Sequence, residues 1–158
     1  MIEYSSETLS PGNLCRTKFP VITGLHDYLF RNKSVIDMDF AEYFPHLTIC
    51  KPTPSFNLAP PILLMGEKCD QRKLFESHFG SAAFTSGRTP DDELEKLSAY
   101  GYEYAFKNGT FCQECEALVR FPSGQKLVPF VRYMARYDDP GGRTLIAYAA
   151  NLLDRTLQ

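Results

Sequence analysis

The chain has 158 residues, 44% of them hydrophobic and 13% aromatic, which fits one domain with a substantial core. Its formal net charge is −2, and its 17 basic and 19 acidic side chains are scattered along the chain. Because no basic stripe is present that could neutralise phosphates, nucleic acid is not an expected partner.

The N-terminus does not resemble a targeting signal. Residues 1–13 are polar and lack a charged start followed by an apolar run of signal-peptide length. No stretch reaches the roughly 18 apolar residues needed to cross a bilayer. The five cysteines are odd in number, so a disulfide framework is not expected without an export signal. We expect a cytoplasmic protein with reduced thiols and no membrane partner.

The first predicted element is a helix at residues 20–31, after a lead-in over residues 1–17 that contains Ser, Thr, Pro and Gly with little periodicity. Thr17 can cap this helix, and Pro20 suits its first turn. The apolar side chains recur at helical spacing and define a single apolar face. They are Val21, Ile22, Leu25 and Leu29.

Short elements are predicted between this helix and the middle of the chain. A helix at residues 39–44 ends at Pro45, which cannot continue the hydrogen-bond ladder. Strands follow at residues 46–51 and 62–66, joined by a proline-rich loop. A helix at residues 70–79 then ends at a glycine.

The clearest helix start in the chain is TPDDELEKL. Thr89 can cap the helix, and Pro90 occupies the first helical position. Asp92 then places a carboxylate at the positive end of the helix dipole. We expect the helix to end near Lys107, where an Asn-Gly pair follows.

Three long strands are predicted to complete the chain as an antiparallel meander. They cover residues 111–121, 126–137 and 143–153, and PSGQ and DDPGG supply the turns. Pro129 removes a donor from the middle strand, so we expect a bulge there. The last strand is apolar on both faces, which is typical of a central strand covered on each side. One face carries Leu145, Ala147 and Ala149, and the other carries Ile146, Tyr148 and Leu152.

A homodimer is predicted from the outer face of this sheet. We expect the helices between residues 70 and 107 to cover one face and the N-terminal helix to cover the other. One short helix does not cover a large apolar face, and contiguous exposed apolar surface commonly marks an association site. The apolar side chains expected on that outer face are Val128, Phe130, Met134, Ile146 and Tyr148.

Three stretches resemble a PAS domain, a small sensory fold with a sheet on one side of a ligand pocket and helices on the other. They are FAEYFPHLTICK, ILLMGEKCDQRKLFESHFG and VRFPSGQKLVPFVRYMARYDDPGGRTLIAYAANLLD. With the order of a helix, two short strands, several helices and a meander, they are similar to stand-alone bacterial PAS proteins over residues 40–154. The resemblance implies an α+β fold with a PAS-like five-stranded antiparallel sheet, helices on one face and an N-terminal helix on the other. Residues 1–38 would form the lead-in and flanking helix, and residues 39–158 the PAS-like domain.

The resemblance also bears on cofactors. The chain lacks an Asn-Cys-Arg-Phe-Leu-Gln type stretch, so light sensing through a cysteinyl flavin is not expected. Haem-binding members usually offer a histidine on the helix facing the sheet, which makes His78 a candidate haem ligand. A histidine beside Phe75 and Phe79 is more often a core residue, and both interpretations stay open.

The segment CQEC contains two cysteines, Cys112 and Cys115, separated by two residues. In a strand, an odd offset sends two side chains to opposite faces. Their Cα atoms would lie about 10 Å apart at about 3.3 Å per residue, beyond the limit of about 7 Å for a disulfide. No second CxxC or histidine cluster completes a zinc site. We expect Cys115 to face the helices and Cys112 to be comparatively exposed.

An aromatic-rich interior is the remaining candidate for a functional site. Pockets lined by aromatic side chains with a few polar ends suit small organic ligands. A filled core without a cavity is an equally open alternative. The expected ligand-binding residues are His78, Phe79, Tyr104, Phe111, Cys115 and Tyr133.

Catalytic activity is not predicted, because the chain contains no hydrolase elbow, zinc-protease motif or P-loop. The leading hypothesis is a sensory or regulatory protein that binds a small ligand or a partner protein and signals through a conformational or dimer change. One alternative is a small enzyme resembling the nuclear-transport-factor-like α+β fold, with an acid or base in its pocket. Another is a scaffolding module with a filled core.

Overall fold

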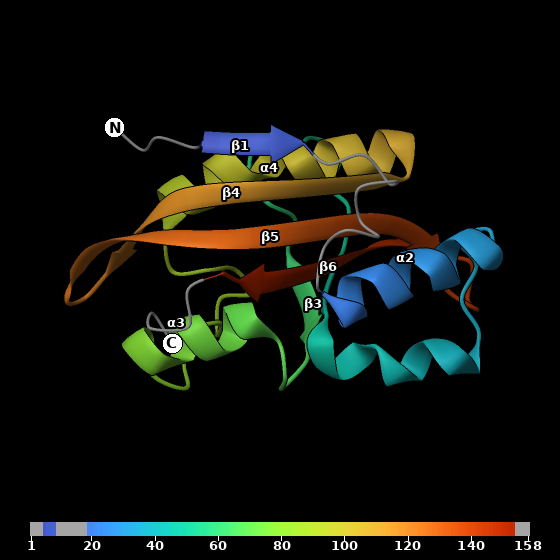
Figure 1. Ribbon diagram of the computed structural model, residues 1–158, viewed down its shortest axis with the longest axis horizontal. Helices are drawn as coiled ribbons and strands as arrows, with labels where there is room; N and C mark the ends of the chain where they lie inside the picture. The colour runs from blue at the N-terminus through green and yellow to red at the C-terminus, as the bar shows by residue number, and fades with distance from the viewer. Residues whose placement is uncertain (1–4, 9–18, 154–158) are drawn as a thin grey trace.

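The computed structural model describes residues 5–8 and 19–153 of the chain. These residues form an α+β fold with one antiparallel sheet, whose strands lie in the order β1-β4-β5-β6-β2-β3 (Figure 1). All five predicted strands are present in this sheet. An unpredicted strand, β1 (Ser5–Thr8), pairs with β4 and adds a sixth. Its sequence SSET has no apolar alternation, so no local pattern marked it as a strand.

The three C-terminal strands form the predicted meander. They are β4 (Thr110–Phe121), β5 (Gly124–Asp138) and β6 (Thr144–Leu152). The short strand β2 (Thr48–Cys50) pairs with β6 on one side and with β3 (Ile62–Met65) on the other. The strand β6 is therefore central, as its two apolar faces predicted.

The bulge predicted at Pro129 is absent. Pro129 lies directly opposite Glu116, and the pairing of β4 with β5 continues without a shift. The Pro129 carbonyl accepts a hydrogen bond from the Leu153 N–H at 3.0 Å, so its backbone nitrogen points to the same side, past the end of β6. The missing N–H therefore leaves the pairing of β4 with β5 intact and affects only the end of the β5–β6 ladder, next to Leu153.

The helix α2 (Pro20–Arg31) has the predicted bounds, but its predicted cap differs. The N-cap residue is Phe19, whose side chain makes no capping hydrogen bond, and Thr17 lies outside the described residues. Two 3₁₀ turns, η1 (Met38–Glu42) and η2 (Phe44–His46), replace the single helix predicted at residues 39–44. Proline is tolerated in the first turn of η2 because no intrahelical donor is needed there.

Two further helices follow the strand pair β2 and β3. The helix α3 (Asp70–Phe79) has the predicted bounds, and α4 (Asp92–Asn108) starts two residues later than predicted. Its cap is Asp91, whose Oδ1 accepts hydrogen bonds from the N–H groups of Glu93 and Leu94 at 3.1 and 3.2 Å. Thr89 hydrogen-bonds to the side chain of a residue within the helix and does not cap it.

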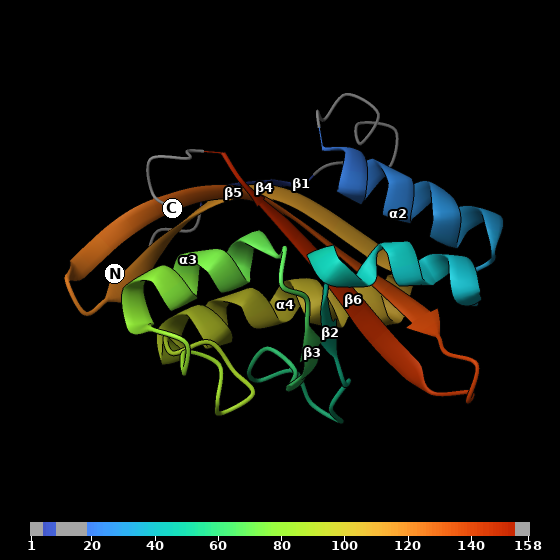
Figure 2. The ribbon, with the colours of Figure 1, turned by 90° about the horizontal axis from the view of Figure 1, so that it is seen from below.

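Helices cover both faces of the sheet, as predicted. Figure 2 shows α3 and α4 on one side of the curved sheet and α2 on the other. The α2 side buries Ile22, Leu25 and Leu29 against strand residues such as Val131 and Tyr133. The α3–α4 side has its own buried clusters, which include Leu74, Phe75, Leu94, Tyr102 and Ala105.

The prediction of an exposed apolar face on the outer side of the sheet is wrong. The five residues expected there, Val128, Phe130, Met134, Ile146 and Tyr148, are buried on the α3–α4 side. The cause is the pairing of β4 with β5, which places Phe130 opposite Cys115 and Met134 opposite Phe111. Directly opposed residues share a face of the sheet, so these side chains belong to the core and are not a dimer surface.

Candidate functional site

A small cavity lies between the sheet and the helices α3 and α4. Its volume is about 50 Å³, and its walls come from both helices, from the strands β3, β4, β5 and β6, and from the segments around Ala59 and Thr89. Most of the wall is apolar, with a limited number of polar side chains. The polar residues are Gln71, Thr89, Glu95, Ser98, Tyr102, Arg132 and Tyr148.

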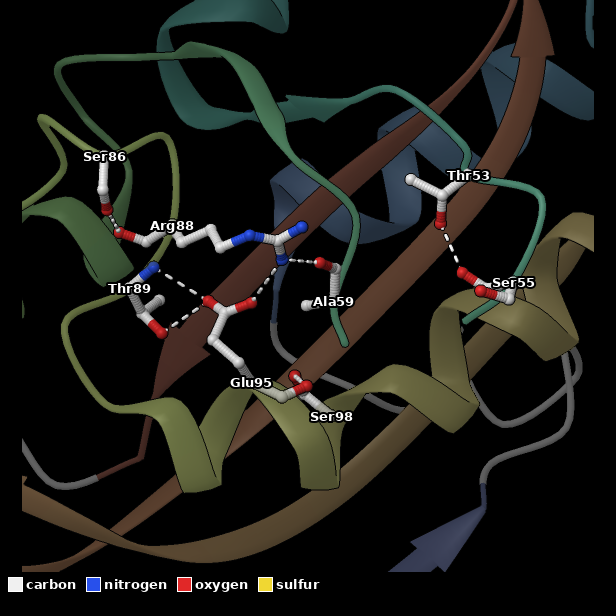
Figure 3. A network of polar contacts seen from close by, with 8 residues as sticks. All are labelled: Thr53, Ser55, Ala59, Ser86, Arg88, Thr89, Glu95 and Ser98. Carbon is white, nitrogen blue, oxygen red and sulfur yellow. Dashed lines mark hydrogen bonds and ion pairs between the residues drawn. The ribbon is translucent and has the colours of Figure 1, made fainter. Parts of the chain in front are cut away.

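Glu95 on α4 ties two loops to one end of this cavity (Figure 3). Its Oε1 accepts hydrogen bonds from the N–H and the hydroxyl of Thr89 at 2.8 and 2.6 Å, and its Oε2 lies 3.4 Å from Nη1 of Arg88. Arg88 also donates to the carbonyl of Ala59, and the Ala59 N–H donates to the Glu95 carbonyl at 2.9 Å. The cavity wall at this end is therefore held by one carboxylate and one guanidinium.

Glu95 is buried, and only 4% of the residue's surface is exposed. Burial raises the pKa of Glu95, while the hydrogen bonds from Thr89 and the charge of Arg88 oppose that rise. A buried carboxylate is costly unless it is paired and hydrogen-bonded. The contacts with Thr89 and Arg88 supply that compensation.

Arg132 on β5 is a second charged residue that lines the cavity. Its residue exposure is 0%. Its Nε donates to Oε1 of Gln113 at 2.8 Å, and its Nη1 donates to the Ser98 carbonyl on α4 at 3.1 Å. The guanidinium carbon lies 5.1 Å from the ring centre of Tyr100 and 5.4 Å from that of Phe111, within cation–π range. These contacts hold the guanidinium in one orientation.

Two tyrosines add hydroxyl groups to the wall. The rings of Tyr102 on α4 and Tyr148 on β6 are stacked, with centres 5.6 Å apart. Burial raises the pKa of Tyr102 well above its ordinary value, so its hydroxyl stays protonated and can donate a hydrogen bond. The lining of the cavity thus combines an arginine, two tyrosines and apolar residues.

The predicted site residues on α3 lie beside the cavity but do not line it. The His78 ring stacks on Phe121 with ring centres 4.0 Å apart. Phe79 lies 6.0 Å from both Phe75 and Phe121, measured between ring centres. Phe75, which was not in the predicted set, lines the cavity.

Three of the other predicted residues lie on the α3–α4 side, but none lines the cavity. Cys115 is buried there, as predicted. Phe111 is buried and its ring contacts that of Tyr104. Tyr104 itself is largely at the surface, with 52% of the residue exposed.

Tyr133 faces the opposite side of the sheet from the cavity. It packs under α2, where its hydroxyl lies 2.9 Å from Nδ1 of His26. The expectation that it joins Phe111 in one pocket is wrong, because Tyr133 pairs with Cys112 and shares that residue's face.

The two cysteines of CQEC point to opposite faces, as strand geometry predicted. Cys112 packs in the α2 cluster and Cys115 in the α3–α4 cluster. The expected exposure of Cys112 is wrong, because α2 covers it and leaves it 4% exposed. Burial raises the pKa of the Cys112 thiol to about 12, so it stays protonated at neutral pH and is a poor nucleophile.

Haem does not fit this site. His78 does not line the cavity, and its imidazole is stacked on Phe121. The volume of about 50 Å³ is far below the roughly 300–1,000 Å³ of pockets that hold larger organic ligands. Within the described part of the chain, no group of three or more His, Cys, Asp or Glu residues could hold a metal ion.

The charged residues of the cavity were missed by sequence reasoning. Glu95 lies in the predicted helix start TPDDELEKL, where no role was predicted for it. Arg132 interrupts the apolar run VPFVRYM, and a charged residue within a strand covered on both faces was the available signal. The pairing of strands was needed to show which face it occupies.

Searched against models of known protein families, the sequences of curated proteins and the solved structures, the chain finds no match. None of the helices among residues 19–153 is long and apolar enough to cross a membrane.

Proposed function

We propose that the protein is a PAS-like sensory or regulatory domain that binds a small molecule in the cavity between its sheet and the helices α3 and α4. The observation that carries this proposal is the composition of the cavity wall. Apolar side chains surround a few buried polar groups, among them Arg132 and Tyr102. This is the usual chemistry of small-molecule sites, in which apolar walls supply affinity and placed polar groups supply orientation.

The arrangement of elements supports the same proposal. From η1 to β6 the chain runs through short helical turns, two short strands, two helices and a three-stranded meander, which is the order on which the resemblance to PAS domains rests. The cavity lies between the sheet and the helices that follow the second strand. A ligand pocket is expected at the same place in the PAS-like interpretation.

Signalling would follow from a shift between two arrangements of helices and sheet. The wall of the cavity draws on α3, α4, four strands and the loops tied by Glu95, so a ligand contacts elements that can move relative to one another. A ligand that prefers one arrangement shifts the population by its difference in affinity for the two. The sheet carries α2 on its other face, which offers a route from the cavity to the surface.

Self-association through the region of α2 is part of this proposal. Three apolar side chains at the end of α2 and just after it are exposed: Phe30, Val35 and Met38. Exposed apolar surface commonly marks an association site. Light scattering coupled to size exclusion, with Phe30→Glu and Met38→Glu variants, tests whether the protein forms a dimer that these substitutions dissociate.

A second candidate function is favoured by Glu95, a buried carboxyl group in the cavity wall whose pKa is raised by burial. Such a group suits an enzyme that uses a pocket acid or base. However, both oxygens of Glu95 already accept hydrogen bonds from Thr89 and Arg88, and this engagement favours a structural role. Turnover of a bound ligand that Glu95→Gln abolishes would establish the enzyme instead.

The ligand-binding proposal is tested by thermal unfolding in the presence of a library of small metabolites, with native mass spectrometry of the purified protein. A ligand at about 100 times its Kd is expected to stabilise the fold by about 2.7 kcal/mol, which raises the Tm by about 5–10 °C for a chain of this size.

A matched pair of variants locates the binding. Ala150 lines the cavity, and Ala149 beside it faces α2. Ala150→Val is expected to abolish the ligand-dependent rise in Tm, whereas Ala149→Val keeps it, although each added side chain costs about 1–3 kcal/mol of stability. If no compound raises the Tm, or if both variants respond to the ligand equally, the cavity is not the binding site.

A further inference from the structure

The charged side chains that line the cavity are engaged with other groups of the protein. Both oxygens of Glu95 accept hydrogen bonds from residues 88–89. Nε and Nη1 of Arg132 donate to Gln113 and to the Ser98 carbonyl. A charged ligand would have to compete with these contacts, and an ion that is buried without full pairing is costly. The cavity therefore favours an uncharged ligand.

Apolar side chains make up most of the remaining wall. Leu74 and Phe75 come from α3, Leu94 from the first turn of α4, and Val128 and Leu152 from β5 and β6. All five are buried and belong to one cluster. A ligand in this space meets mainly carbon, so most of its affinity comes from the burial of its own apolar surface.

Tyr102 on α4 carries a polar group that a ligand can use. The residue lines the cavity and is 4% exposed, and its hydroxyl makes no hydrogen bond to the residues that the structure describes. Its ring stacks on Tyr148. The charges of Glu95 and Arg132, which line the same cavity, act on the pKa of this hydroxyl, so the group lies near that space. A buried hydroxyl without a partner is costly, and a ligand with an acceptor removes that cost.

The size of the cavity limits the length of the ligand. Its volume is about 50 Å³, and a single water needs about 10–15 Å³ measured in the same way. The space therefore accommodates about four water-sized groups, at this volume for each group. Acetone is of this size, and long-chain or aromatic ketones are not.

We propose that the cavity binds a short uncharged carbonyl compound, with its carbon among the apolar residues of α3, α4 and the sheet and its oxygen at the Tyr102 hydroxyl. This inference rests on the proposed function and names its ligand class. A carbonyl oxygen accepts the hydrogen bond that a phenol donates. A ketone also brings no donor of its own, whereas the donors of an alcohol or an amide would be left unpaired against an apolar wall.

The test uses three probes of one shape on the full chain: acetone, acetamide and acetate. They are planar and have the same number of non-hydrogen atoms, so they differ in charge and in hydrogen-bond donors. Amide resonances are followed by two-dimensional NMR during titration through the millimolar range. Acetone is expected to shift the resonances of residues 98–102 and Val128, and to bind about tenfold or more tightly than acetamide, whose amide donors would be buried unpaired. Acetate is expected not to bind at the same concentrations.

Val128 and Val131 provide a matched pair on β5. Both are buried, but Val128 lines the cavity and Val131 packs on the α2 side. Replacing Val128 by alanine removes two carbons from the wall, and 3-pentanone is larger than acetone by two carbons. Val128→Ala is therefore expected to bind 3-pentanone about tenfold or more tightly than the wild type does. Val131→Ala is expected to change that affinity by less than about twofold.

A second variant tests the hydrogen bond and covers the case in which Val128→Ala does not fold. Tyr102→Phe removes the hydroxyl and keeps the ring that stacks on Tyr148. It is expected to weaken acetone binding by about threefold or more, the equivalent of one neutral hydrogen bond. Tyr104→Phe is the control, since Tyr104 lies on the same helix and does not line the cavity. Unchanged binding in a folded Tyr102→Phe protein would overturn the proposed orientation of the carbonyl group.

The outcomes separate this inference from the proposed function. If acetamide or acetate binds as tightly as acetone, the ligand class is wrong, although the cavity still binds a small ligand. If no probe binds while a library compound raises the Tm in a manner that Ala150→Val abolishes, only the ligand class fails. If the two valine variants respond alike to 3-pentanone, the ketone does not enter this cavity and the inference is wrong. If nothing binds in the cavity, both proposals fail.

Discussion

Glu95 and Arg132 are charged residues enclosed by an otherwise apolar interior, and each is retained there by specific partners. Glu95 is held by Thr89 and Arg88, and Arg132 by Gln113 and the Ser98 carbonyl. Removing one partner of a buried charged group costs more than the pair contributes, because the remaining group loses its compensation. Substitutions at these residues therefore test the role of each contact.

Glu95→Ala is expected to destabilise the fold by about 2–4 kcal/mol, because it leaves the Thr89 N–H and hydroxyl without their acceptor and the Arg88 guanidinium without its carboxylate partner. The measurement is urea unfolding at pH 7. Glu93→Ala is the control, since Glu93 on the same helix makes a surface ion pair with Lys96 at 3.3 Å, which contributes at most about 1 kcal/mol. Equal effects of the two substitutions would contradict a structural role for the Glu95 contacts.

His26 gives the stability a pH dependence. Burial lowers the pKa of His26 below its ordinary value, and the nearby charge of Asp27 only partly opposes this. The unfolded chain therefore binds a proton on His26 more readily than the folded protein does, so the free energy of unfolding falls as the pH drops through 6.5 towards the lowered pKa.

Urea unfolding between pH 7.5 and 5.5 measures this effect. His26→Gln is expected to flatten the pH dependence in that window and to leave the stability at pH 7.5 lower by about 0.5–1.5 kcal/mol, the contribution of the hydrogen bond to Tyr133. A variant that keeps the full pH dependence of the wild type would show that another group is responsible.

At the scale of elements, α4 connects the cavity with the rest of the core. Its first turns carry Leu94 and Glu95, and Ser98 and Tyr102 follow at spacings that place them on the same side of the helix. Its cap, Asp91, also contacts the sheet, because Oδ2 of Asp91 accepts a hydrogen bond from the Arg120 N–H at 2.8 Å. One carboxylate thus fixes both the start of α4 and its distance from β4.

Asp91→Ala is expected to cost about 2–4 kcal/mol, the sum of a lost helix cap and a buried backbone donor without its acceptor. Hydrogen exchange is expected to accelerate in the first turn of α4 and at the Arg120 amide. Asp92→Ala serves as the control, because Asp92 is exposed in the first turn of α4, where a carboxylate contributes less than about 1 kcal/mol through the helix dipole. Slow exchange at Arg120 in the Asp91→Ala protein would count against this dual role.

At the scale of the molecule, the sheet separates two cores. The α2 core and the α3–α4 core share strands β4, β5 and β6, whose side chains alternate between them. Without α2, the buried side chains of Val131, Ala135, Leu145 and Ala147 would lie against water. The flanking helix therefore stabilises the same folding unit as the rest of the chain.

A core substitution on α2 tests this dependence. Leu25 is completely buried, and Leu25→Ala is expected to lower the free energy of unfolding by about 2–5 kcal/mol in a single cooperative transition. Asp27→Ala on the same helix, where Asp27 is exposed, is expected to change it by less than about 0.5 kcal/mol. A chain beginning at residue 39 is expected to bind a hydrophobic dye, because its sheet face is uncovered. If that shorter chain unfolded cooperatively with the same free energy of unfolding as the full chain, α2 would not belong to the same folding unit as the sheet.

The sequence by itself determined the elements whose signals are local. The bounds of α2 and α3, the turns of the meander and the two apolar faces of β6 follow from periodicity, prolines and glycines, which act over a few residues. The opposite directions of Cys112 and Cys115 follow from strand geometry alone.

Only the tertiary structure decided which face each strand presents to which helix. A shift of one residue in the pairing of β4 with β5 would exchange every side chain between the two cores, and no local pattern distinguishes the two registers when both faces are apolar. For this reason Tyr133 was placed on the wrong side, and Met134 and Phe130 were predicted at the surface. The cavity between Glu95 and Arg132 depends on the same pairing, because it joins residues that lie 37 positions apart in the chain.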